Sequence, residues 1–143
     1  MARAPDQIIA DIRTFEPTGG NWLPLDALLA ELWDSGGAGE HTADLLSVFE
    51  RFPNEDGDVL WGIMHGLEAL PDYEPILVRS VLALPSEMGV LMVGRLLNGG
   101  MSQIGTVSLV ELLREVAASA IAPRSVRESA ARWARKHAEP ARQ

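Results

Sequence analysis

Cysteine is absent from this chain of 143 residues. Disulfide bonds and thiolate chemistry are therefore excluded, together with metal sites built on thiolates. The sequence also lacks any apolar run that approaches the ~18 residues of a membrane-spanning helix. At the N-terminus, MARAPDQIIADIRTFEP carries acidic residues and turn formers where a secretory signal needs an unbroken apolar segment. These absences predict a cytoplasmic protein without a membrane partner.

Basic residues are scarce in the first half of the chain. The formal net charge is −8, but residues 1–77 contain 15 Asp and Glu against 3 Arg, whereas residues 78–143 contain 5 Glu against 9 Arg and Lys. An acidic half attracts basic partners and repels the phosphates of nucleic acids. We therefore expect a protein partner with a basic surface and no nucleic acid. A merely solvated acidic surface is the alternative.

Strand patterns are also missing, because apolar and polar residues nowhere alternate for more than a few positions. The sequence predicts one all-α domain over residues 1–143. Proline and glycine separate about eight short helices. Six are predicted at 5–14, 24–34, 40–52, 58–70, 71–84 and 85–97. Two more are predicted to follow the capping boxes at Ser108–Glu111 and Ser125–Glu128. Short helices with tight turns favour an irregular HEAT-like stack of antiparallel hairpins, with an orthogonal helical bundle as the alternative. The sixth helix is apolar nearly all round and is expected at the centre.

The stretch FERFPNEDGDVLWGIMHGLEAL, residues 49–70, contains an acidic loop that raises the question of a metal site. A calcium-binding EF-hand loop starting at Asn54 needs glycine at its sixth position and glutamate at its twelfth, but the glycine is fourth (Gly57) and the twelfth residue is His65. We expect no metal and no other cofactor. Asp56 or Asp58 as a helix cap is the simplest role for these carboxylates, because negative charge is favourable at a helix N-terminus.

His65 is the second candidate in this stretch. The zinc peptidase motif needs a second histidine four residues away, where Trp61 and Ala69 stand instead. With Glu68 or Asp58 as its partner, His65 would be a general base, which is the enzymatic alternative. A hydrogen-bonded or surface histidine is the more common case. We therefore expect no catalytic residue and no enzyme.

Trp61 shares a helical face with Asp58 and His65. A tryptophan in this setting either anchors the core or forms the centre of a binding surface rimmed by carboxylates. The second interpretation predicts a partner-binding surface formed by Glu50, Glu55, Asp56, Asp58, Trp61, His65, Glu68, Asp72 and Glu74.

Gly62 and Gly66 lie one turn apart in the same predicted helix, where each costs about 1 kcal/mol relative to alanine. Together they form a flat strip that permits the close approach of another backbone. We expect the sixth helix to pack there through Gly89 and Gly94. A partner chain lying on the strip is the functional alternative.

The last predicted helix carries a basic face beside a stripe formed by Val126, Ala130, Trp133 and His137. A capping helix with a solvated basic face is favoured over a nucleic-acid surface, because the chain as a whole is acidic. The sequence contains neither a glycine-rich phosphate loop nor a nucleophile elbow.

The stretch at 49–70 and the later LPSEMGVLMVGRLLNGG resemble helical immunity proteins of bacterial polymorphic-toxin and contact-dependent inhibition systems. The resemblance covers roughly a third of the chain and includes no catalytic motif. It implies a small cytoplasmic protein that binds and neutralises a cognate toxin domain, and many such toxins are basic, nucleic-acid-acting enzymes. A helical-repeat adaptor that binds a cellular protein is the alternative. The oligomeric state stays open.

Overall fold

A computed structural model of the chain describes residues 3–138. Within this range the chain is all-α, as expected, since eight α-helices are accompanied by a 3₁₀ turn, one short hairpin and one isolated β-bridge. The helices are α1 (Pro5–Thr14), α2 (Leu23–Ser35), α3 (Thr42–Arg51), α4 (Asp58–Glu68), α5 (Glu74–Ala83), α6 (Glu87–Asn98), α7 (Leu109–Ala117) and α8 (Arg124–His137). The 3₁₀ turn η1 covers Ala38–Glu40, and the strands β1 (Gln103–Ile104) and β2 (Val107–Ser108) pair antiparallel. No helix in this range has the length and apolar character that a membrane crossing needs.

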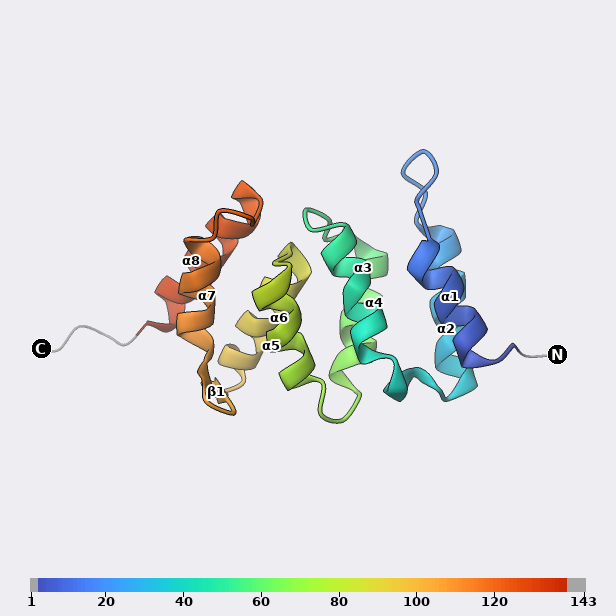
Figure 1. The fold of residues 1–143 in the computed structure, drawn as a ribbon, viewed down its shortest axis with the longest axis horizontal. Helices are drawn as coiled ribbons and strands as arrows, with labels where there is room; N and C mark the ends of the chain where they lie inside the picture. Colours follow the sequence, from blue (N-terminus) through green and yellow to red (C-terminus); the bar gives the residue numbers. More distant parts are fainter. Residues whose placement is uncertain (1–2, 139–143) are drawn as a thin grey trace, which may run out of the picture.

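The helices form a row of hairpins with two layers (Figure 1). In one layer α1 packs on α3, α3 on α5 and α5 on α7, and in the other α2 packs on α4, α4 on α6 and α6 on α8. Successive hairpins begin at Pro5, Thr42, Glu74 and Leu109. These starts are roughly 35 residues apart, near the ~34–47 residues typical of helical repeats. The fold is therefore the irregular HEAT-like stack of antiparallel hairpins, and not the orthogonal bundle.

One hydrophobic core continues through the stack from α1 to α8. Each helix contributes its apolar face, as in α1, where Ile8, Ile9 and Ile12 are buried and the residues between them are exposed. The α6 helix packs against α3, α4, α5, α7 and α8, and most of its side chains are buried. Its predicted central position is confirmed.

Two tryptophans pack on glycines of the neighbouring helix in the even-numbered layer. The indole of Trp33 in α2 lies on Gly66 of α4, and the indole of Trp133 in α8 lies on Gly94 of α6. A β-carbon on either glycine would overlap the ring, whereas Gly62 meets open space. The expected glycine-to-glycine contact between α4 and α6 is therefore wrong, because an indole ring and not a backbone fills the space at Gly66.

The two predicted capping boxes have different outcomes. Ser108 accepts a hydrogen bond from the backbone N–H of Glu111 (3.3 Å) and caps α7 as expected. Ser125 does not cap α8, which already begins at Arg124. Its hydroxyl donates instead to Oδ1 of Asn54 (2.9 Å), so it ties the last hairpin to the loop between α3 and α4.

Three helices, α3, α5 and α6, begin later than their sequences indicate, and α6 starts at Glu87 where 85 was predicted. The residues before α3 form the separate turn η1, and α3 starts only at Thr42. Asp72 adopts a left-handed conformation (φ 58°), so the chain cannot enter a helix at Pro71 and α5 starts at Glu74. The hairpin of β1 and β2, with Gly105 at positive φ (60°) in its turn, was not predicted, because the sequence shows no strand pattern there.

Candidate functional site

The nine residues predicted to form one partner-binding surface lie at separate places in the stack. Glu55, Asp56 and Asp58 occupy the loop before α4 and its first turn, at the upper edge in Figure 1. Asp72 and Glu74 occupy the turn after α4 and the start of α5, at the lower edge. The 11 residues of α4 separate the two groups by about 16 Å. The acidic residues therefore do not form a single rim around Trp61.

Glu50 lies in the other layer, on α3. Its half-buried carboxylate accepts a hydrogen bond from the Ser80 hydroxyl of α5 (2.5 Å). Because this bond joins two successive hairpins, Glu50 contributes to the packing of the stack and has less capacity to meet a partner.

Trp61, His65 and Glu68 share one strip of α4, as predicted. The Trp61 side chain is 37% exposed, and its ring centroid lies 6.0 Å from that of His65. The Glu68 carboxylate accepts two hydrogen bonds from Arg95 of α6, at 2.7 and 2.9 Å. Its nearest oxygen is 3.8 Å from Nδ1 of His65, beyond hydrogen-bond distance. Glu68 therefore ties α4 to α6 and orients Arg95, not His65.

An open pocket of about 450 Å³ adjoins this ion pair and is lined by Tyr73. Burial raises the pKa of Tyr73 to about 12, and the carboxylates of Glu68 and Glu74 add to the shift. The hydrogen bonds that Arg95 donates to the Glu68 carboxylate raise the pKa of Arg95. At neutral pH the pocket therefore offers a phenol that keeps its proton and a cation that already has a partner.

The carboxylates of Glu55, Asp56 and Asp58, at the start of α4, are free to contact a ligand. Their side chains are exposed and have no hydrogen-bond or ion-pair partner within residues 3–138. The N-cap of α4 is Gly57, without a side-chain hydrogen bond, so the predicted cap role of Asp56 or Asp58 is wrong. Asp58 still lies in the first helical turn, where the helix dipole favours negative charge. Glu55, Asp56 and Asp58 thus present unpaired negative charge at one edge of the stack.

A small pocket beside these carboxylates was not predicted from the sequence. Its volume is about 90 Å³, and it is lined by Trp22 together with Val59 and Leu60 and by the edge residues Glu55 and Asp58. The pocket thus combines an indole and apolar side chains with two unpaired carboxylates. The sequence feature that could have indicated this pocket is GGNWLP, in which a tryptophan lies in a glycine-rich turn and not on the buried face of a helix.

The Trp22 indole is held in place by other aromatic rings. It packs edge-to-face on Phe52, with ring centroids 5.0 Å apart, and at a tilt on Phe15, 5.6 Å away. The guanidinium of Arg51 lies over the Phe52 ring at 5.0 Å and donates to the carbonyl groups of Ile12 and Phe15. These contacts fix the wall of the pocket before any ligand arrives.

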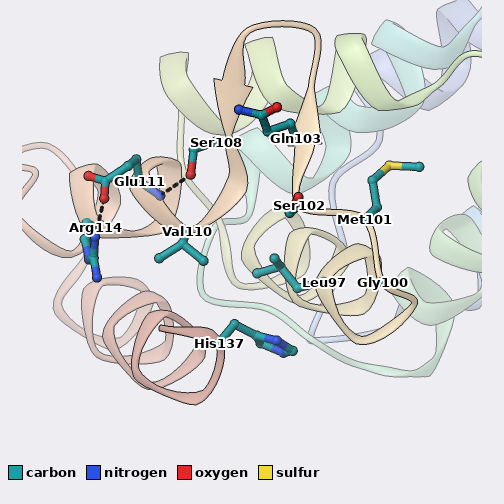
Figure 2. A pocket seen from close by; sticks show the side chains of 10 residues that line it. All are labelled: Leu97, Gly100, Met101, Ser102, Gln103, Ser108, Val110, Glu111, Arg114 and His137. Carbon is teal, nitrogen blue, oxygen red and sulfur yellow. Dashed lines mark hydrogen bonds and ion pairs between the residues drawn. The ribbon is translucent and has the colours of Figure 1, made fainter. Parts of the chain in front are cut away.

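Figure 2 shows a larger opening of about 480 Å³ between the β-hairpin, the end of α6 and helices α7 and α8. Its polar groups are largely engaged within the protein. Ser108 caps α7, Arg114 pairs with Glu111, and Nε2 of His137 is 2.9 Å from Oδ1 of Asn98. This opening therefore offers little free charge to a ligand.

The basic helix α8 covers the end of the stack. Val126 and Ala130 are fully buried, and Trp133 lies on α6, so this stripe faces the core as expected for a capping helix. Arg124 pairs with Glu128 at 3.0 Å, and the Lys136 ammonium lies over the Trp133 ring at 5.0 Å. The side chains of Arg124 and Lys136 thus lie on the outer side of the last helix.

No group of three or more His, Asp or Glu side chains placed to hold a metal occurs in the described part of the chain. Comparisons with protein-family models, curated proteins and solved structures gave no significant match. The resemblance to immunity proteins therefore gains no support from them, and the function has to be inferred from the surface itself.

Proposed function

We propose that this chain is a binding protein that captures a basic protein domain and neutralises it by occupation, without catalysis. The observation that carries the proposal is the gathering of three unpaired carboxylates, Glu55, Asp56 and Asp58, beside an apolar pocket at one edge of the stack. Such charges accelerate the encounter with a basic surface. Apolar contacts in the pocket beside them slow dissociation.

The partner that fits this surface is a protein and not a nucleic acid, because the acidic half of the chain repels phosphate. The resemblance of residues 49–70 to immunity proteins suggests a cognate bacterial toxin domain, whose own nucleic-acid-binding cleft would supply the basic surface. On this proposal the complex forms in the cytoplasm of the cell that produces both proteins.

The test first asks whether the gene directly upstream encodes a large secreted protein with a variable C-terminal domain, and then expresses that domain with and without this chain. Co-expression should restore growth, and the association rate of the purified pair should fall about tenfold or more between low and high salt. Toxicity that persists despite co-expression would exclude neutralisation. An association rate insensitive to salt would exclude the electrostatic part of the proposal.

Two variants with the same change in net charge show whether the dependence of the association rate on salt comes from the upper edge or from the lower edge. Neutralising the upper edge (Glu55→Gln with Asp58→Asn) should slow association and weaken its dependence on salt. Neutralising two carboxylates of the lower edge (Asp72→Asn with Glu74→Gln) changes the net charge equally and should have a smaller effect. Equal effects would show that net charge alone matters.

The two-layer stack also favours a second function, that of an adaptor for a protein of its own cell, since stacked helical hairpins present extended binding surfaces. The same unpaired carboxylates would then meet a cellular ligand. A cellular protein that binds the purified chain, loses affinity when Glu55 and Asp58 are neutralised and has no toxicity would favour the adaptor.

A further inference from the structure

We propose that the pocket beside Trp22 receives one arginine side chain of the basic partner. The inference rests on the proposed function and adds to it the contact that anchors the partner.

The two kinds of wall in this pocket select the ligand. Trp22, Val59 and Leu60 provide an apolar lining, and Glu55 and Asp58 provide negative charge. Arginine joins an apolar stem to a planar cation that stacks on an indole and pairs with carboxylates through several N–H groups. A purely apolar side chain would bury these carboxylates without a partner, which is costly. A lysine would pair with the carboxylates, but it has no planar group to stack on the indole ring.

The size of the pocket limits the occupant to one side chain. About 90 Å³ admits the end of a long side chain but not a helix or a nucleotide. The aromatic contacts of Trp22 with Phe15 and Phe52 hold its ring in place, so little conformational entropy is lost when a guanidinium stacks on it. The pocket thus combines a fixed aromatic surface with unpaired charge.

Trp61, the most exposed tryptophan on the acidic half, lacks this combination. Trp61 lies beside His65, and the nearby Glu68 carboxylate is already bound by Arg95. A cation arriving there would compete with an existing ion pair. Trp22 is therefore the better anchor for a cation, although Trp61 is the more exposed side chain.

The experiment follows the indole N–H signals of the four tryptophans by two-dimensional NMR, assigned with single Trp→Phe variants. The probe is N-acetyl-arginine amide, and the control is N-acetyl-citrulline amide, which has nearly the same shape without the charge. The Trp22 signal should shift saturably with the arginine probe and should stay in place with the citrulline compound. The Trp61 signal should move less.

Charge variants decide whether the carboxylates take part. Glu55→Gln with Asp58→Asn should weaken binding of the arginine probe about tenfold or more, as expected for the loss of two charge-assisted hydrogen bonds. The control Asp72→Asn with Glu74→Gln should bind as the unmodified chain does. The proposal is overturned if Trp22 does not respond, if citrulline shifts it equally, or if neutralising Glu55 and Asp58 leaves the affinity unchanged.

The inference and the proposed function can fail separately. If the upstream toxin domain is neutralised equally well by the unmodified chain and by Trp22→Ala, the arginine pocket is wrong and the proposed function stands. If the arginine probe binds at Trp22 but the toxin domain is not neutralised, the proposed function is wrong and the pocket remains as a site for another arginine-bearing ligand.

Discussion

Substituting alanine should raise stability at Gly62 of α4, whereas at Gly66 of the same helix it should leave stability unchanged or lower it. Gly62 and Gly66 lie one turn apart in the same helix, so the gain in helix propensity, about 1 kcal/mol, is the same for both. Gly62 meets open space, and Gly62→Ala should raise the free energy of unfolding by up to about 1 kcal/mol. At Gly66 the new methyl group would overlap the Trp33 ring, whose Cε2 would lie only 3.1 Å away and two further ring atoms closer still.

The cost at Gly66 is that of an overpacked core, about 1–3 kcal/mol. Because the gain in helix propensity is the same at both positions, this cost is also the expected difference in the free energy of unfolding between Gly62→Ala and Gly66→Ala. For a chain of 143 residues it corresponds to a separation in Tm of roughly 3 °C for each kcal/mol. Urea unfolding followed by circular dichroism measures the free energies, and thermal scans measure the separation in Tm.

A third variant shows whether the ring is the cause. Trp33→Leu removes the indole atoms that the methyl group would overlap, so Gly66→Ala made in that background should be neutral or stabilising. The two substitutions would then show a coupling energy of the kind that a double-mutant cycle measures. The packing described for Gly66 is refuted if Gly66→Ala is as stable as Gly62→Ala, or if its cost persists after Trp33→Leu.

Two further predictions concern pH. Burial acts to raise the pKa of Asp44, but hydrogen bonds from His41 and Arg13 outweigh it and lower the pKa below 3.8. The ionised Asp44 therefore stabilises the folded state above pH 3.8, and this stabilisation is lost as the pH falls through the pKa that Asp44 has in the folded protein. Urea unfolding of the unmodified chain and of Asp44→Asn should therefore differ at about pH 7 and converge in strong acid, and a constant difference would contradict this account. Tyr73 is the only tyrosine, so an ultraviolet absorbance titration of the folded protein should give a midpoint of about 12 and not 10.0. Since the raised pKa favours the folded state only while the phenol is neutral, stability should decline between these two pH values, and a midpoint near 10 with circular dichroism unchanged would contradict the burial of Tyr73.

The helices and their stacking could be predicted because local signals determine them. Prolines and glycines separate the segments, and the spacing of apolar residues within each segment gives a single buried face, as for Ile8, Ile9 and Ile12. Connections of a few residues then leave antiparallel neighbours as the simplest packing. The displaced start of α5 depends on the conformation of one residue, Asp72, which composition does not reveal.

The contacts between hairpins could not be predicted in the same way. Gly66 and Gly94 both leave room for a close neighbour, but nothing in the local sequence indicates that Trp33 and Trp133 fill that room. The same limit applies to the site. The sequence suggests an acidic, aromatic surface near residue 61, and it contains no signal that Arg95, 27 positions further along, binds the Glu68 carboxylate.

Two groups of acidic residues in the first half of the chain differ in their contacts. Some are bound by cations or hydroxyl groups across helix contacts, as Glu31 is by Arg3, Asp44 by Arg13, and Glu68 by Arg95. Those at the start of α4 are exposed and take no part in these contacts within residues 3–138. Neutralising the first kind changes stability, whereas neutralising Glu55 and Asp58 should lower the free energy of unfolding by no more than about 1 kcal/mol, because only Asp58 lies in the first turn of α4, where the helix dipole favours its charge. A loss of partner binding caused by these two substitutions is for that reason evidence about the binding surface and not about folding.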